Sequence, residues 1–142
     1  MRAGEIMTTG AATVRPETTL AEAAQIMVEH RVSGLPVVDD QGKLVGIITE
    51  GDFLPTDAGQ RSSPFEILAR GEKTAGDLRT RLVKEIMTLD PISIPVETPV
   101  EEAIERMRSH RIKRLPVLAE GRIVGILSRA NVLAALVRRI PA

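Results

Sequence analysis

The chain contains one block of sequence twice, and this repeat limits the possible folds more than any other feature. The first copy starts with EIMT at Glu5, and the second starts with EIMT at Glu85. Equivalent residues are 80 positions apart as far as Asp40 and 79 apart beyond Gln41, which has no counterpart in the second copy. Roughly two positions in five are identical, so the sequence predicts two copies of one supersecondary unit.

The apolar residues of both copies predict the same first elements. A short extended segment near Val14 or Ile94 leads into a stretch with apolar residues at helical spacing. These helical positions are Leu20, Ala23, Ala24 and Met27 in the first copy and Val100, Ala103, Ile104 and Met107 in the second. Both helices are expected to begin at capping residues. The caps are Thr18 or Thr19 followed by Glu22, and Thr98 followed by Pro99 at the first helical position and Glu101.

Two apolar runs follow each helix, LPVV and KLVGIIT in the first copy and LPVL and RIVGILS in the second. Each pair predicts a β-hairpin whose turn needs a positive φ at Gly42 or Gly121. A second helix is expected to begin at Thr49 and at Ser128. The expected fold class is α/β (α+β), with two β-α-β-β-α repeats. Because one such unit can hardly bury its sheet alone, we expect the two to pack about a pseudo-twofold axis, with the functional surface in the clefts between them.

The chain is expected to divide into two repeats and a connecting segment. Its parts are a first repeat at residues 1–54, a linker at residues 55–84 and a second repeat with a C-terminal helix at residues 85–142. The linker is predicted to be partly helical, because a capping box begins at Ser63 and the apolar residues of 74–84 have near-helical spacing. Pro55 lacks a backbone N–H, so we expect it to end or kink the helix begun after Thr49.

The charge balance and the scarcity of aromatic side chains exclude several classes of partner. Lys plus Arg and Asp plus Glu number 19 each, so no global field draws the chain to nucleic acid or to an anionic membrane. With two Phe, no Tyr and no Trp, single-stranded nucleic acid would find almost no stacking surface. The sequence has no cysteine and no apolar run long enough to span a membrane. We therefore expect a cytoplasmic protein that binds neither nucleic acid nor membrane.

The sequence contains no recognisable catalytic or metal-binding motif. It has no P-loop, no H-E-x-x-H, no G-x-S-x-G and no cysteine nucleophile. His30 and His110 recur at the predicted ends of the first helices, but without a nearby carboxylate or cysteine pattern they are a poor metal site. A histidine at that position instead complements the negative end of the helix dipole. We expect no enzymatic activity, no metal and no required cofactor.

Three motifs of the repeat resemble those of a CBS domain, namely EIMT, HRVSGLPVVD and GIITEGD. The tandem pair resembles a Bateman module, and the resemblance covers nearly all of the chain except the linker. It implies a stand-alone CBS pair that binds an adenosine-containing ligand such as AMP, ADP or ATP, or in some members S-adenosylmethionine, NAD or a cyclic dinucleotide. It also implies a regulatory, energy-sensing role, a homodimer and an effector protein whose identity the sequence does not give.

The resemblance assigns the leading ligand site to Thr49 and Asp52. It implies that the aspartate accepts hydrogen bonds from both ribose hydroxyls, and an ionised carboxylate, which only accepts, suits a vicinal diol. The Thr49 hydroxyl and the N–H groups of the helix start would face a phosphate. A purely structural interpretation stays open, because Thr49 can cap the helix and Asp52 can complement its dipole. In the second copy Ser128 keeps the hydroxyl but Asn131 replaces the aspartate, so ribose binding there should be weaker or absent.

The resemblance adds residues of the extended segment and of the hairpin starts to the ligand cleft. They are Thr13, Val14, Ser33, Gly34, Leu35 and Pro36 in the first copy and Lys113, Arg114, Leu115 and Pro116 in the second. Lys113 and Arg114 could reach a phosphate, or could form a solvated edge that deters strand pairing. The adenine is expected to sit between aliphatic side chains, with backbone groups near Thr13 and Val14 reading its edge.

Two functions stay open on the sequence. The first is a sensor in which a nucleotide at Asp52 changes the packing of the repeats and a partner protein reads the change in trans. The second is a ligand-free structural or assembly module that uses its helices and the tail LAALVRRIPA for protein contacts. Nucleic-acid binding through Arg138, Arg139 and the pair Lys113 and Arg114 is disfavoured by the zero net charge.

Overall fold

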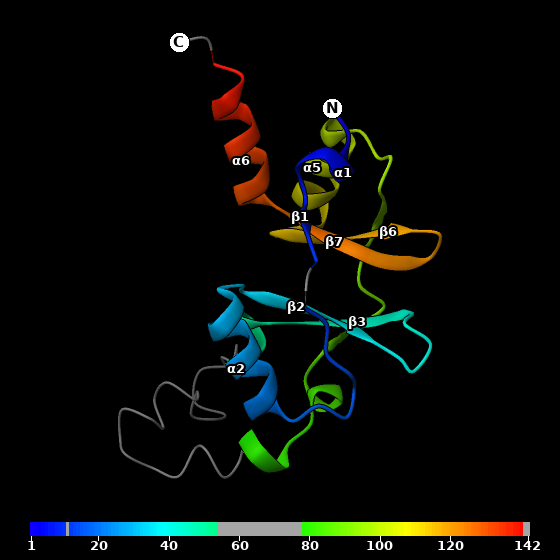
Figure 1. Cartoon of the computed structure of the whole chain (residues 1–142), viewed down its shortest axis with the longest axis vertical. Coiled ribbons are helices and arrows are strands. Elements are labelled where there is room, and N and C mark those ends of the chain that lie inside the picture. Colours follow the sequence, from blue (N-terminus) through cyan, green and yellow to red (C-terminus); the bar gives the residue numbers. More distant parts are fainter. Residues whose placement is uncertain (11, 54–77, 141–142) are drawn as a thin grey trace. The chain divides into compact units, whose positions relative to one another are not determined.

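A computed structural model of the chain describes residues 1–10, 12–53 and 78–140 (Figure 1). The chain forms two compact units, the middle unit (Ala12–Asp90) and the terminal unit (Met1–Ala11 with Pro91–Ala142). The units divide the chain differently from the sequence repeats, because each EIMT segment belongs to the unit that holds the hairpin of the other copy. The linker features predicted at Pro55 and Ser63 lie outside the described residues.

The middle unit is built on a three-stranded antiparallel sheet in the order β2-β3-β4. Strands β2 (Gly34–Val38) and β3 (Leu44–Thr49) form the predicted hairpin, and β4 (Thr88–Leu89) pairs with β3. Val14 adds a parallel bridge to Val37 on the other side of β2. Helix α2 (Leu20–His30) packs against this hairpin (Figure 1). The described part of the unit also has two 3-10 helices: η1 (Glu50–Phe53) follows β3, and η2 (Val83–Glu85) precedes β4.

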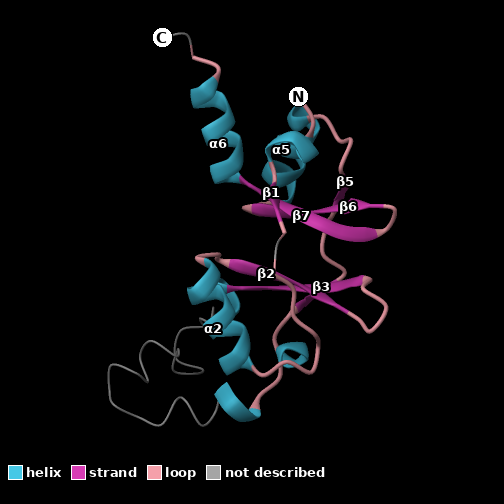
Figure 2. Cartoon of the chain, in the orientation of Figure 1, coloured by secondary structure: helices cyan, strands magenta, loops and turns pink. Residues whose placement is uncertain are grey.

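The terminal unit has a four-stranded sheet in the order β1-β7-β6-β5. Its strands are β1 (Thr8–Thr9), β5 (Ile94–Pro95), β6 (Arg114–Ala119) and β7 (Arg122–Ser128). Its helices are α1 (Ala3–Ile6), α5 (Val100–His110) and α6 (Arg129–Arg138). Figure 2 shows α6 leaving the end of β7, as the sequence predicted for Ser128. The order β5-α5-β6-β7-α6 is the predicted β-α-β-β-α repeat, and the predicted fold class of mixed helices and sheets is confirmed.

Each unit has its own apolar core, and the helices bury the faces that their apolar spacing predicted. Ala24 and Ile104 are the predicted face residues that are only half-buried. The buried core of the middle unit consists of Val14, Leu20, Ala23, Met27, Leu35, Val37, Ile48 and Val83. That of the terminal unit consists of Ala3, Ile94, Ala103, Met107, Leu115, Val117 and Leu127. Since burying one such large aliphatic side chain contributes roughly 1.5–3 kcal/mol, these cores hold the hairpins and helices together.

The start of α2 carries the predicted capping box. The hydroxyl of Thr19 accepts a hydrogen bond of 3.1 Å from the N–H of Glu22, and the Glu22 carboxylate accepts one of 3.4 Å from the N–H of Thr19. The helix predicted for residues 74–84 is interrupted, because this part of the linker pairs with the start of α2. Residues 78–80 are helical and η2 follows, but Leu82 is extended and forms a bridge with Thr19.

The start of α5 differs from the prediction. The cap expected at Thr98 is wrong, because Pro99 holds the N-cap position and no side chain caps this helix. The N-terminal segment covers the helix start instead. The N–H of Ala3 donates to the carbonyl of Thr98 at 2.8 Å, and the N–H of Val100 donates to the carbonyl of Met1 at 3.0 Å. The N–H of Leu20 at the start of α2 likewise donates to the carbonyl of Arg81 at 2.9 Å, so a backbone segment distant in sequence covers both helix starts, and α2 has a side-chain cap in addition.

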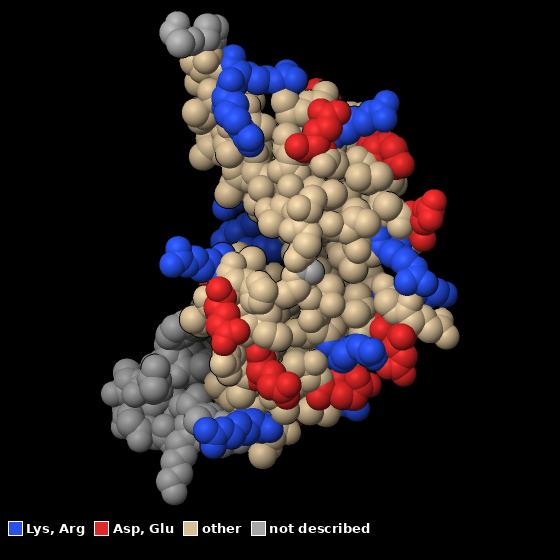
Figure 3. Space-filling model, in the orientation of Figure 1, with Lys and Arg blue, Asp and Glu red and all other residues tan. Residues whose placement is uncertain are grey.

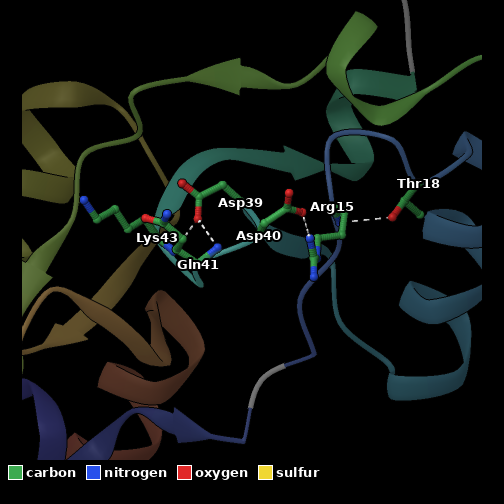
Figure 4. Close-up of polar contacts among 6 residues, drawn as sticks. All are labelled: Arg15, Thr18, Asp39, Asp40, Gln41 and Lys43. Atoms are coloured by element: carbon green, nitrogen blue, oxygen red, sulfur yellow. Dashed lines mark hydrogen bonds and ion pairs between the residues drawn. The ribbon is translucent and has the colours of Figure 1, made fainter.

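The hairpin turns have the predicted glycines in the left-handed region, with φ of 80° at Gly42 and 79° at Gly121. In the middle unit, Oδ1 of Asp39 accepts 2.9 Å hydrogen bonds from the N–H groups of Gln41 and Lys43 (Figure 4). The bond from Lys43 is the main reason why the pKa of Asp39 is lowered from its ordinary value of 3.8. The Asp39 carboxylate therefore stabilises this turn in its ionised form.

The EIMT segment of each copy pairs with the second hairpin strand of the other copy. Thr8 of β1 lies opposite Ile126 of β7, and Thr88 of β4 lies opposite Ile47 of β3. With the repeat offsets of 80 and 79, these two pairings are equivalent. The exchange explains why the compact units do not follow the sequence repeats.

No helix within the described ranges is long and apolar enough to cross a membrane. The face drawn in Figure 3 carries basic and acidic side chains interspersed, without one large field of a single sign. This distribution agrees with the equal numbers of acidic and basic residues in the sequence.

Candidate functional site

The middle unit brings two stretches of the predicted site together. The register of the hairpin pairs Gly34, at the start of β2, with Thr49, at the end of β3. The N–H of Glu50 then donates to the carbonyl of Ser33 at 2.9 Å, which extends the pairing by one step. Residues 33–34 and 49–52 therefore lie side by side because a hairpin places the start of its first strand beside the end of its second.

The carboxylate of Asp52 is held at this end of the hairpin. Its Oδ2 accepts a hydrogen bond of 2.8 Å from the N–H of Thr49 and lies 3.4 Å from the Thr49 hydroxyl. Both residues are half-buried, and η1 carries the chain from one to the other. The arrangement is the one expected of a structural cap, and it also fixes an acceptor-only group at Thr49, which pairs with Gly34. The structural and ligand-binding interpretations of this pair are compatible.

The equivalent position of the terminal unit is hydrogen-bonded through both its carbonyl oxygen and its amide nitrogen. Asn131 Oδ1 accepts hydrogen bonds from the N–H of Ser128 at 2.8 Å and from its hydroxyl at 3.0 Å. The Asn131 N–H donates to the Ser128 hydroxyl at 3.2 Å, which completes a capping box at the start of α6. The amide Nδ2 donates to the hydroxyl of Thr8 at 3.2 Å. Both ends of the Asn131 side chain are therefore engaged, so this site offers less to a ribose than a carboxylate would.

The extended segment before α2 joins the middle-unit site through Val14. Its N–H donates to the carbonyl of Pro36 at 3.0 Å, and its carbonyl accepts from the N–H of Val38 at 2.9 Å. These two bonds occupy the backbone groups that were expected to read an adenine edge at Val14. Thr13 is exposed and takes part in none of the hydrogen bonds of the described residues. Of Thr13 and Val14, only Thr13 therefore has backbone groups that could meet a ligand.

The remaining predicted residues lie on the first hairpin strands. Leu35 and Leu115 belong to the cores of their units, and Pro36 and Pro116 are fully buried within their strands. They are thus part of the framework of each hairpin. Arg114 is half-buried and lies opposite Ser128 in the register of β6 and β7, as Gly34 lies opposite Thr49.

Lys113 is exposed and lies next to the start of α6, because the N–H of Arg129 donates to its carbonyl at 3.0 Å. It lines a cavity between α5 and α6. Both predicted interpretations, a phosphate contact and a solvated edge, fit this exposure.

The histidines lie at the helix ends, as the sequence predicted. His30 and His110 are the last residues of α2 and α5, and both are exposed. Nδ1 of His110 lies 3.1 Å from the carbonyl of Arg106 in the last turn of α5. Within the described residues, no group of three or more His, Cys, Asp or Glu side chains could hold a metal ion.

The residues that cross between the two copies were not predicted from the sequence. Met7 lies against Gly125, and Met87 lies against Gly46, so the recurring methionines pack on the hairpin of the other copy. A signal for this contact was present in the sequence. A glycine inside an apolar strand often marks the close approach of another segment, and each copy has one in its VGI motif.

A comparison with protein families now assigns this duplicated fold. The model of the CBS domain matches residues 3–58 and again residues 83–138. The chain belongs to the CBS domain family. The motif of Thr49 and Asp52 and its counterpart at Ser128 and Asn131 fall within the two matched CBS regions, at the end of the second hairpin strand in both.

Solved structures of other CBS pairs resemble this chain over nearly its whole length. CBSX2 of Arabidopsis thaliana in complex with AMP is 30% identical, with a TM-score of 0.78 and 99% of both chains covered. The CBS domain pair of protein MJ0100, in complex with 5′-methylthioadenosine and S-adenosyl-L-methionine, is 26% identical, with a TM-score of 0.77 and coverage of 99% of this chain and 98% of that one. Adenosine-containing molecules are thus bound to two similar CBS pairs.

One curated relative is longer than this chain. The chloroplastic protein CBSX1 of Arabidopsis thaliana is 32% identical over 135 residues, which cover 86% of this chain. The match spans 57% of CBSX1, so a large part of that protein has no counterpart in the sequence described here.

Proposed function

We propose that the protein is a regulatory CBS pair that binds an adenosine-containing nucleotide and modulates a partner protein in trans. The observation that carries the proposal is the carboxylate of Asp52, held at 2.8 Å by the N–H of Thr49, the residue that pairs with Gly34 at one end of the middle hairpin. The similarity to CBS pairs in complex with AMP and with S-adenosyl-L-methionine supports an adenosine ligand. AMP, ADP and ATP are the first ligands to test.

Asp52 is proposed to accept hydrogen bonds from the two ribose hydroxyls. An ionised carboxylate has several acceptor positions and no donor, so it can accept from the diol while Oδ2 keeps its bond to Thr49. The Thr49 hydroxyl and the backbone of residues 50–52 would face the phosphate, and the exposed Thr13 would lie at the adenine side. Ser33 and Gly34 would line the same site, with the small Gly34 allowing close approach of the ligand.

Isothermal titration of the purified chain with AMP, ADP, ATP and S-adenosylmethionine tests this assignment. Asp52→Asn keeps the shape of the side chain and removes its charge, and hydrogen bonds to charged groups contribute roughly 1.5–3 kcal/mol each. The affinity should therefore fall about tenfold or more. Glu17→Gln is the matched control, because Glu17 is an exposed carboxylate of the same unit. Equal affinity of Asp52→Asn and the unmodified chain would rule out Asp52 as the ribose ligand.

The second CBS repeat provides a reciprocal variant. Asn131→Asp restores the family carboxylate in the terminal unit, and the Thr8 hydroxyl can turn to donate to it. We expect nucleotide affinity at this repeat to rise, seen as added binding stoichiometry in the same titration. An unchanged stoichiometry would mean that the identity of residue 131 does not limit binding there.

Regulation in trans requires that the nucleotide favours one of two arrangements of the protein, because a ligand shifts an equilibrium only by its differential affinity. The immobilised chain should therefore capture its effector protein from a cell extract to different extents with and without the nucleotide. The difference should disappear with Asp52→Asn. If the same protein were captured to the same extent with and without the nucleotide, nucleotide binding would have no regulatory role. The proposal contains no catalytic step, and incubation with ATP should leave ATP intact.

An assembly module is the second candidate, because α6 exposes an apolar stripe. Leu133, Leu136 and Val137 on α6, with Ile140 just beyond it, are 57–69% exposed and recur at helical spacing. Such a stripe is expected at a protein contact, including a homodimer. Light scattering after gel filtration would give the oligomeric state, and Val137→Glu with Ile140→Glu should convert a dimer into a monomer. If no nucleotide binds and this dimer forms, the assembly function is favoured.

A further inference from the structure

The terminal unit contains a cavity of about 610 Å³ between α5 and α6. Its volume falls in the range of roughly 300–1,000 Å³ that is typical of small-molecule sites. Aliphatic side chains form most of its wall. They are Ile104, Met107, Ile112, Val132, Leu133 and Leu136. Ile104, Ile112 and Val132 are half-buried, and Leu133 and Leu136 are exposed at 63% and 57%, so much of this wall is open to an apolar ligand.

The polar part of the lining is entirely cationic among the described residues. It consists of Arg108, Arg111, Lys113 and Arg129. Arg108 has an exposed ion pair with Glu105 at 3.5 Å. No ion pair between described residues involves the side chains of the other three cations. These three charges are therefore available to an anion.

The backbone fixes where these cations start. Arg111 ends α5 in the left-handed conformation, with φ of 54°, and its N–H donates to the carbonyls of Arg108 and Met107. Lys113 and Arg129 are joined by the 3.0 Å bond between the carbonyl of the first and the N–H of the second. The charged residues thus surround the cavity from the end of α5, the start of β6 and the start of α6.

The first repeat serves as an internal comparison, since its described elements α2, β2 and β3 are the equivalents of α5, β6 and β7. The residues equivalent to Arg108, Lys113 and Arg129 are Val28, Ser33 and Glu50, and only Arg111 has a basic counterpart, at Arg31. The helix and the hairpin of the repeat therefore form without this cluster of cations. The fold therefore does not require Arg108, Lys113 and Arg129, the three cations that have no basic counterpart in the first repeat.

From this combination we propose that the cavity between α5 and α6 binds the anion of a single-chain fatty acid. The acyl chain would lie against Ile104, Ile112 and Val132, where removal of apolar surface from water provides affinity. The carboxylate would be bound by Lys113, Arg111 and Arg129, since hydrogen bonds between ionised groups are the stronger kind. This inference goes beyond the proposed nucleotide site, and none of the residues of that site in the middle unit lines the cavity.

Titration with decanoate tests the proposal, because its chain and its charge can be removed separately. Decanoate should bind and raise the melting temperature of the full chain. Decanol, which has the chain without the charge, and butyrate, which has the charge with a short chain, should each bind at least about fivefold more weakly. The affinity for decanoate should also fall as salt is added, because the cations are exposed. Equal binding of decanol and decanoate would overturn the role of the cations.

Two pairs of variants assign the binding to this cavity. Lys113→Gln combined with Arg129→Gln should weaken decanoate binding at least about fivefold, whereas Arg122→Gln, at an exposed cation outside the cavity, should leave it unchanged. Leu136→Glu should abolish binding by placing a carboxylate in the wall. Val28→Glu, at an exposed apolar residue of α2 that does not line the cavity, should have no effect.

A second copy of the chain is the competing occupant, since Leu133 and Leu136 belong to the exposed stripe of α6 as well as to the cavity wall. The proposal would be overturned if the chain formed a dimer that Leu136→Glu dissociates and if neither the dimer nor the monomer bound decanoate. Loss of binding in the cavity variants with AMP binding intact would support the fatty-acid site independently of the nucleotide site. If Asp52→Asn abolished AMP binding and left decanoate binding unchanged, the nucleotide site would be supported independently of the fatty-acid site.

Discussion

Two glycines make the crossing of the EIMT segments possible. A Cβ atom added at Gly125 would lie 2.6 Å from both Sδ of Met7 and the backbone oxygen of Thr8. At Gly46 it would lie 2.8 Å from Sδ of Met87 and 3.0 Å from the carbonyl oxygen of Thr88. A side chain can move away from a new methyl group, but the backbone of a paired strand moves only if the pairing is disturbed. The tighter backbone contact therefore makes Gly125 the more demanding position.

Gly125→Ala should lower the free energy of unfolding by about 1–3 kcal/mol, as overpacking in a filled site usually does. Gly46→Ala should have the smaller effect, because the Met87 thioether is flexible and the backbone contact is longer. Urea denaturation of both variants measures the difference. Gly51→Ala is the control, since its added Cβ would make only an ordinary contact of 3.6 Å with the Thr49 hydroxyl. An equal loss of stability in all three variants would show that helix and strand propensity, and not the crossing, determines the effect.

Side-chain caps and backbone groups distant in sequence both form hydrogen bonds at the helix starts. Thr19 and Glu22 cap α2, and Ser128 and Asn131 cap α6, so both elements begin where local sequence places a capping box. The start of α5 has a similar local pattern but no side-chain cap, while distant backbone carbonyls accept from the first N–H of both α2 and α5. Local patterns therefore predicted that a helix starts here, but not which groups satisfy its N–H donors.

Thr19→Ala should destabilise the protein by about 1 kcal/mol, the usual effect of removing an N-cap side chain. Thr19→Ser retains the hydroxyl and should stay close to the unmodified protein. Chemical denaturation of the two variants in parallel gives the comparison. If alanine and serine were equally stable, the bridge between Thr19 and Leu82 would be sufficient to hold the start of α2 without the capping box.

The β2–β3 turn should respond to pH through Asp39. Its folded-state pKa is lowered, chiefly by the hydrogen bond from the Lys43 N–H, so its stabilising contribution is fully present above the unfolded value of 3.8. That contribution is lost as pH falls through the lower folded-state pKa. NMR titration of the Asp39 side-chain carboxyl should give a midpoint below 3.8. Asp39→Asn should reduce the pH dependence of stability in this range, and a midpoint at or above 3.8 would contradict the assigned hydrogen bonds.

The terminal unit depends on both ends of the chain. Ala3 is fully buried in its core, β1 forms the edge of its sheet, and the carbonyl of Met1 accepts from the N–H of Val100 at the start of α5. The middle unit takes its own crossing strand, β4, from the EIMT segment of the second copy. Each unit is consequently assembled from residues of both repeats, which links their folding through the chain.

Removal of residues 1–9 should destabilise the terminal unit selectively. The deletion uncovers β7 and the start of α5, so amide hydrogen exchange should become faster in residues 100–103 and 122–128. Exchange in α2 and β2 should change much less, because no residue of 1–9 belongs to the middle unit. Faster exchange in α2 with unchanged protection in β7 would contradict the observed pairing.

Local sequence determined the repeat, the helix faces, the hairpins with their turn glycines and the caps at Thr19 and Ser128. Each follows from the spacing or chemistry of residues close together in the chain. Tertiary structure alone decided that β1 joins β7 and that β4 joins β3, because two nearly identical segments have the same local preferences and only long-range packing separates the possible partners. It also decided the backbone cover at α5 and the gathering of Arg111, Lys113 and Arg129 around one cavity. In the sequence these cations are ordinary charged residues, and only the fold of the terminal unit gives them a common position around the cavity.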